Sequence, residues 1–146
     1  MSTTTAFARS STSPTSKSLS VGLWSAQAVL AAAFLMAGGM KITAPLDELR
    51  AQMPWVSGSM GSAVRFIGAA EVAGALGLVL PSVTRIQPKL TPLAAVGLLT
   101  IMILATATHA SRGEFPMIGA NVVLGALAAF VAWGRFAKAP IVPRGA

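Results

Sequence analysis

The sequence predicts an all-α integral membrane protein, a four-helix up-down bundle joined by short loops. Of its 146 residues, 54% are hydrophobic and only 10% are charged, a balance that soluble domains of this size rarely reach. Four stretches also have the roughly 20 mostly apolar residues that a helix needs to cross a hydrocarbon core about 30 Å thick. The connections between the later stretches are short, which forces helices adjacent in sequence to pack side by side.

The four expected membrane spans hold very few polar side chains. The first is uncharged, with Gln27 as its most polar member, and the second carries Arg65 and Glu71. The third ends at His109, and the fourth has Asn121 as its only strongly polar residue. We place the spans at residues 19–40, 62–80, 90–109 and 116–134, within one domain that covers residues 19–136.

Two tails flank this domain. Residues 1–18 are rich in Ser and Thr and lack acidic residues, which is typical of a disordered segment. An organelle transit peptide has a similar composition, but this segment is short for one. Residues 137–146 form a short basic tail.

The first loop has an internal pattern of its own. Leu46, Leu49 and Met53 recur at helical spacing after Pro45, and Pro54 closes the segment. This pattern predicts a short amphipathic helix on the outer membrane surface.

The basic residues flank the spans and indicate an orientation. Four spans put both termini on one side, together with Arg9, Lys17, Arg85, Lys89, Arg135, Lys138 and Arg144. The other side has fewer basic residues: Lys41, Arg50, Arg65 and Arg112. The positive-inside rule therefore places both termini in the cytoplasm. Because the basic residues are not clustered on one folded surface, nucleic acid is not an expected partner.

The polar side chains of the spans are expected to gather in the outer half of the bundle. Glu71 lies about 14 Å below the outer end of its span, where a charge costs about 2.5 to 3.5 kcal/mol. Lys41, Arg65, His109 and Asn121 lie toward the same end, so every helix contributes a polar group. We expect a polar pocket open to the outer face and plain apolar packing in the inner half.

Each of these residues also has a structural interpretation. Lys41 and Arg65 could snorkel to the headgroups, His109 could end a helix there, and Asn121 could hold two helices together. Glu71 could form a structural ion pair with a neighbouring base. No metal is expected, because one histidine, one deep glutamate and no cysteine are too thin a ligand set.

Several short motifs resemble the DoxX-like family of small four-helix bacterial membrane proteins. These are FLMAGGMKI at residues 34–42, GAAEVAGALGLVLP at residues 68–81, AAVGLLTIMILATATH at residues 94–109, and Asn121 early in the last helix. The resemblance covers about residues 27–135. Its recurring positions match Gly38, Lys41, Glu71, His109 and Asn121, and it implies a multi-pass protein of the bacterial inner membrane.

The resemblance implies only a loose function, since some relatives take part in quinone-linked sulfur oxidation or oxidative-stress complexes. Our first hypothesis is a quinone-binding protein or a subunit of a membrane oxidoreductase complex, which need not be catalytic alone. Glu71 and His109 would handle protons as catalytic residues, while Lys41, Arg65 and Asn121 would bind the ligand. The alternatives are a small transporter or permease component and a non-catalytic assembly subunit.

Overall fold

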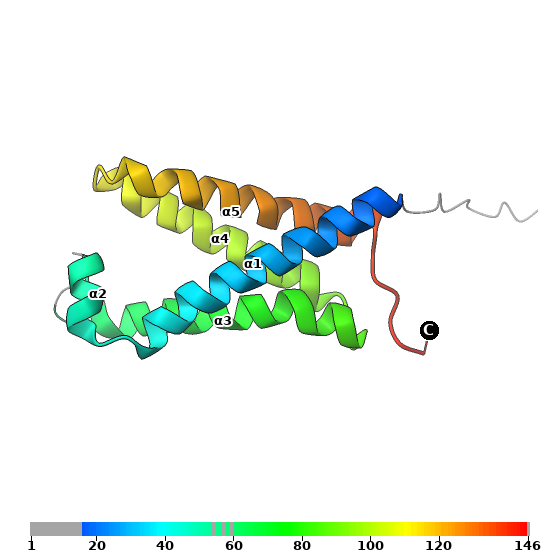
Figure 1. The fold of residues 1–146 in the computed structure, drawn as a ribbon, viewed down its shortest axis with the longest axis horizontal. Coiled ribbons are helices and arrows are strands. Elements are labelled where there is room, and N and C mark those ends of the chain that lie inside the picture. Colours follow the sequence, from blue (N-terminus) through cyan, green and yellow to red (C-terminus); the bar gives the residue numbers. More distant parts are fainter. Residues whose placement is uncertain (1–15, 54, 57, 59, 146) are drawn as a thin grey trace, which may run out of the picture.

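The computed structural model describes residues 16–53, 55–56, 58 and 60–145, and within them the protein is all-helical. Figure 1 shows long helices running the length of the molecule and a short helix, α2, across one end. In the described residues, four helices are long and apolar enough to cross a membrane, which confirms the predicted fold. The elements are α1 (Lys17–Thr43), α2 (Leu46–Gln52), α3 (Met60–Thr84), α4 (Leu90–Ser111), α5 (Phe115–Trp133) and the π-helix η1 (Gly134–Lys138).

The helices extend beyond the predicted spans at several ends. The α1 helix begins at Lys17, two residues before the expected start, because the Ser16 hydroxyl accepts a hydrogen bond from the backbone N–H of Leu19 at 3.2 Å and so caps the helix. After α5, η1 continues the chain to Lys138, into the segment expected to be a tail. Residues 1–18 are expected to be disordered, and of these, residues 1–15 lie outside the part of the chain that the structure describes.

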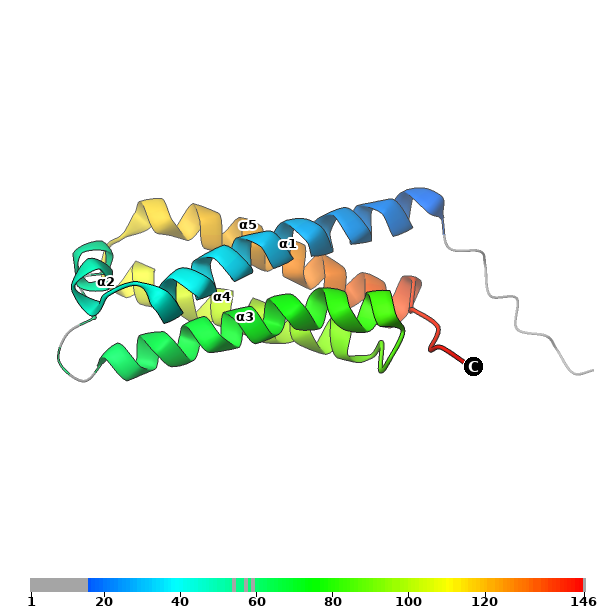
Figure 2. The same ribbon diagram turned by 60° about the horizontal axis from the view of Figure 1, so that its bottom comes forward.

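The two ends of the bundle carry different elements. The α2 end holds α2 and the α4–α5 connection, and the terminal end holds the start of α1, the α3–α4 connection and η1, as Figures 1 and 2 show. The α1 helix runs diagonally between these ends, beside α5 at the terminal end and beside α3 at the α2 end.

An apolar core joins the four long helices. Its largest fully buried members include Leu30 and Phe34 of α1, Leu78 of α3 and Leu98 of α4. Many other large apolar side chains remain exposed, such as Met36 and Phe66, which are 76% and 75% exposed. This is the pattern of a helix bundle that faces lipid on its outside.

Glycines allow α1 and α3 to touch backbone to backbone near the α2 end. A Cβ atom added to Gly38 would lie 2.6 Å from the carbonyl oxygen of Gly68, and one added to Gly68 would lie 2.8 Å from that of Gly38. Real Cβ atoms do not come this close to a carbonyl oxygen. The Gly38–Gly68 crossing, meaning this contact, is therefore the close approach of small residues that packing in lipid favours.

The predicted short helix is confirmed as α2, and its apolar side packs on the protein. Leu49 is fully buried in a small cluster with Val56 and Val64, separate from the main core. Leu46 lies against Gly61, where an added Cβ would be 3.1 Å from its Cδ2 atom. The α2 helix is therefore held against the start of α3, with Asp47, Glu48 and Arg50 exposed.

The crossing predicts that Gly68→Ala destabilises the bundle. The added methyl group has no space, and overpacking of this kind costs about 1 to 3 kcal/mol. Gly39→Ala is the matched control, because a Cβ at Gly39 meets nothing within 4 Å. Thermal unfolding in detergent should show a lower melting temperature for Gly68→Ala only. Equal melting temperatures for the two variants would contradict a tight crossing.

Candidate functional site

The deepest charged group of the α2 half, Glu71, forms an ion pair with Lys41 beside the Gly38–Gly68 crossing. The Nζ atom of Lys41 donates to Oε1 of Glu71 at 2.9 Å and to Oε2 at 2.7 Å. The Glu71 side chain is 4% exposed and that of Lys41 16%. Both carboxylate oxygens are thus paired, which offsets the cost of burying the charge. The close crossing brings these two side chains within reach of each other.

Arg65 lies next to this pair and binds the end of α1. Its Nη1 atom donates to the carbonyl oxygen of Lys41 at 2.6 Å, and its Nη2 atom donates to that of Ala44 at 2.7 Å. The last carbonyl groups of a helix have no partner within the helix, and they carry its negative dipole end. Arg65 therefore caps α1 and fixes the turn that leads into α2.

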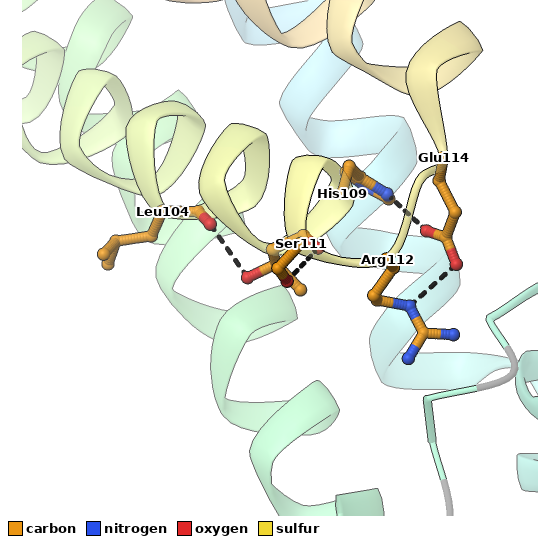
Figure 3. Close-up of polar contacts among 6 residues, drawn as sticks. Leu104, His109, Ser111, Arg112 and Glu114 are labelled. Atoms are coloured by element: carbon orange, nitrogen blue, oxygen red, sulfur yellow. Dashed lines mark hydrogen bonds and ion pairs between the residues drawn. The ribbon is translucent and has the colours of Figure 1, made fainter.

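His109 belongs to a different group of polar side chains, at the α4–α5 connection. Figure 3 shows His109 and Arg112 pointing toward Glu114. The Nδ1 atom of His109 lies 2.7 Å from one Glu114 oxygen, and the Nε atom of Arg112 donates to the other oxygen at 2.7 Å. Gly113, with a φ of 71°, makes the tight turn that returns Glu114 to these partners.

The two bases favour the charged form of Glu114. The hydrogen bond from Arg112 is the main cause that lowers the pKa of the Glu114 carboxyl below its ordinary value, and the hydrogen bond with His109 adds to it. Glu114 also stands at the N-terminal end of α5, where a negative charge is favoured by the helix dipole. The cluster therefore stabilises the α4–α5 hairpin.

Asn121 lines a lipid-facing groove of about 300 Å³ between α4 and α5. Apart from Asn121 and Thr106, the lining is apolar: Leu99, Met102, Ile103, Val122, Gly125, Ala126 and Ala129. The Nδ2 atom of Asn121 is buried and has no hydrogen-bond partner. An unpaired buried donor is costly and is found in few places in native proteins. The described residues therefore leave this donor unsatisfied.

The sequence-predicted residues thus fall into separate groups. Lys41, Arg65 and Glu71 lie together between α1 and α3, whereas His109 and Asn121 belong to the α4–α5 hairpin. No hydrogen bond or ion pair among the described residues joins the two groups. A second groove, of about 480 Å³ between α3 and α4, is apolar and contains none of the five. Their binding and catalytic roles stay predictions.

The expectation of plain apolar packing in the inner half is wrong. Four buried polar side chains, one from each long helix or its continuation, meet at the terminal end: Gln27, Ser82, Thr91 and Arg135. Gln27 donates to the carbonyl oxygen of Leu78 at 2.6 Å and to the Ser82 hydroxyl at 3.1 Å. The hydroxyl groups of Ser82 and Thr91 lie 2.8 Å apart, and the Nε atom of Arg135 donates to Gln27 at 2.7 Å.

Sequence reasoning missed this terminal polar network for two reasons. Serine and threonine carry no charge and can pair with the backbone of their own helix, so they give little signal in an apolar span. From its position in the sequence, Arg135 is expected to flank the last span, yet it is only 5% exposed. The one usable signal was Gln27, an amide in the middle of an otherwise apolar span.

The Glu114 cluster predicts a pH-dependent contribution to stability. Because the folded-state pKa of Glu114 is lowered, its stabilisation is present above the pKa of the unfolded chain and is lost as the pH falls through the folded value. Glu114→Gln should therefore melt at a lower temperature than wild type at pH 7 and approach wild type at pH 3. Glu48→Gln is the control, since exposed Glu48 has no ion pair among the described residues. A difference that stays constant with pH would contradict the role of the carboxylate.

Comparison with known proteins identifies a family for this chain. A sequence model of the DoxX-like family matches residues 25–131. No curated protein and no solved structure matches the chain significantly. The matched region runs from the first half of α1 nearly to the end of α5, and it includes the Lys41–Glu71 pair, the Glu114 cluster and the Asn121 groove. This multi-pass membrane protein belongs to the DoxX-like family.

Proposed function

We propose that this protein binds a small apolar, quinone-like molecule that enters the α4–α5 groove from the lipid. The observation that carries the proposal is the unpaired Nδ2 donor of Asn121, a buried atom of a side chain that lines this largely apolar groove. A quinone carbonyl oxygen would accept that hydrogen bond, and its ring and tail would contact the apolar lining. The protein would act in a redox complex of the bacterial inner membrane, with both termini in the cytoplasm.

Thr106 gives the groove a second polar group. Its hydroxyl donates to the carbonyl oxygen of Met102 at 2.8 Å, so its oxygen keeps lone pairs that can accept a hydrogen bond. A reduced quinol, which carries hydroxyl donors, would find this acceptor while its oxidised form would use Asn121. His109 lies in the last turn of the same helix, within the same hairpin as the groove. We therefore keep His109 as the candidate proton-handling group.

The Lys41–Glu71 pair supports a second candidate function, an assembly role without catalysis. Both Glu71 oxygens are paired with Lys41, and Arg65 is engaged by two carbonyl oxygens of α1 and its C-terminal turn. Such a satisfied cluster fixes the register of two helices. Proton transfer by Glu71, in a redox complex or a transporter, would require this pair to open.

The ligand proposal predicts that Asn121→Leu weakens quinone binding about tenfold or more, because a neutral hydrogen bond and the cost of its loss amount to about 1 to 3 kcal/mol. Purified protein would be titrated with a short-chain ubiquinone and a naphthoquinone, with intrinsic tryptophan fluorescence or calorimetry as readout. Thr106→Val should weaken binding of the reduced form more than that of the oxidised form.

Thr108→Val is the matched control for Thr106→Val. Thr108 makes the same kind of hydrogen bond, to the carbonyl oxygen of Leu104 at 2.9 Å, but it is exposed and lies outside the groove. It should leave binding unchanged. Absence of quinone binding by the wild type, or equal binding by wild type and Asn121→Leu, would refute the proposal.

The assembly candidate predicts a stability effect without a ligand effect at Glu71. Glu71→Gln leaves Lys41 buried without a counter-charge and should destabilise the bundle by about 3 kcal/mol. Lys41→Met in the same chain should recover part of that loss, since it removes the unpaired charge. Chemical or thermal unfolding of both single variants and the double variant gives the coupling energy. Additive effects would show that the two side chains do not act as a pair.

A further inference from the structure

We propose that Arg135, at the terminal end, is a binding site for the phosphate group of an anionic phospholipid headgroup. Arg135 lies in η1 and is 5% exposed. The site is separate from the α4–α5 groove and from the Lys41–Glu71 pair, so the inference does not depend on the proposed function.

Among the described residues, no side chain of opposite charge pairs with Arg135. The chain has four acidic residues, Asp47, Glu48, Glu71 and Glu114, and none of them pairs with Arg135. Three of them pair with bases toward the α2 end of the bundle. Guanidinium groups stay protonated in proteins, and a buried charge without a counter-charge is strongly unfavourable. A bound anion would remove that cost.

The guanidinium group is held firmly on one edge and incompletely satisfied on the other. Its Nε atom donates to Oε1 of Gln27 at 2.7 Å, and its Cζ atom lies 5.1 Å from the ring centroid of Trp24. On the opposite edge, Nη1 reaches the carbonyl oxygen of Ala139 only at 3.3 Å, and Nη2 is buried without a partner. Nη1 and Nη2 form the planar fork that binds two phosphate oxygens at once.

The backbone that carries Arg135 is fixed by close packing against α1. An added Cβ at Gly134 would collide with the side chain of Leu23, so α1 and η1 are in direct contact at this point. Gln27 is in turn held by Leu78 and Ser82 of α3. The orientation of the fork is therefore set before any ligand arrives, which lowers the entropy cost of binding.

The C-terminal tail covers this fork. Ala139 is 6% exposed, and its N–H donates to the carbonyl oxygen of Gly134 at 2.7 Å. Figures 1 and 2 show the tail running from η1 past the α3–α4 connection, where the N–H of Arg144 donates to the carbonyl oxygen of Arg85 at 3.0 Å. Phosphate would replace the carbonyl oxygen of Ala139 on the fork, so binding lifts the start of the tail.

The surroundings favour a lipid phosphate over a free one. Trp24 and Trp133 lie at the terminal end of α1 and α5, where tryptophan marks the membrane interface. Lys17, Arg85, Lys89, Lys138 and Arg144 are exposed at the same end and attract anionic headgroups. The exposed residues attract an anionic headgroup over a distance. Arg135, by contrast, offers its buried Nη1 and Nη2 atoms in a fixed position for direct hydrogen bonds to the phosphate.

The binding test compares Arg135→Gln with Arg144→Gln, which removes one exposed charge from the same end. Each protein would be held in phosphatidylcholine nanodiscs and titrated with phosphatidylglycerol or with inorganic phosphate, with retained lipid counted by native mass spectrometry. Arg135→Gln should weaken phosphatidylglycerol binding about tenfold or more, and Arg144→Gln less than twofold. An equal loss of phosphatidylglycerol affinity in both variants would mean that the lipid is held by surface attraction only. If inorganic phosphate alone saturated the Arg135 site, its ligand would be a free anion. Either result overturns the lipid site.

A second measurement keeps Arg135 intact and remains valid if Arg135→Gln fails to fold. The chain has no cysteine, so single variants Ala139→Cys and Val142→Cys can be labelled with a maleimide without background. Phosphatidylglycerol should raise the labelling rate of buried Ala139→Cys severalfold, relative to Val142→Cys, which lies in the same tail and is already exposed. If phosphatidylglycerol left the ratio of the two labelling rates unchanged, the tail would not lift. The proposed replacement of the Ala139 carbonyl oxygen by phosphate would then be overturned.

Discussion

The bundle depends on the need to satisfy every polar group inside a medium that offers no water. The Lys41–Glu71 pair meets this need at one place, where both carboxylate oxygens accept from a single ammonium group. The pairing is possible only because Gly38 and Gly68 let α1 and α3 approach to backbone contact. Arg65 then binds the carbonyl groups at the end of α1. Packing and electrostatics at this crossing are therefore one structural unit.

The same constraint shapes the terminal end in a different way. There Gln27 uses its carbonyl oxygen to accept from Arg135 and its amide to donate to α3, and Ser82 passes the network to Thr91. In the α2 half, buried Glu71 is paired with Lys41. In the terminal half, buried Arg135 has no acidic partner among the described residues. Because of this difference in charge balance, an anion would be stabilised at Arg135. It also gives the two ends of the bundle different chemistry.

The α4–α5 hairpin carries the features that point to a ligand. Its turn is fixed by Glu114 between Arg112 and His109. Its groove is lined by Asn121, whose buried Nδ2 atom has no partner among the described residues. A hairpin with a mostly apolar groove and two polar side chains, Asn121 and Thr106, suits a molecule that partitions into the membrane. The α1–α3 pair would then serve as the scaffold against which this hairpin packs.

The sequence by itself determined the class of protein, the number and approximate ends of the spans, the short helix α2 and the residues of the α2 half that deserve testing. Hydrophobic length and the position of charges carry this information directly, because the bilayer penalises any other arrangement. Partners across helices were decided by the tertiary structure alone. Helix rotation and crossing angle set whether Glu71 meets Lys41 and whether Arg135 turns inward to Gln27. These depend on how glycines and side chains of several helices pack at once.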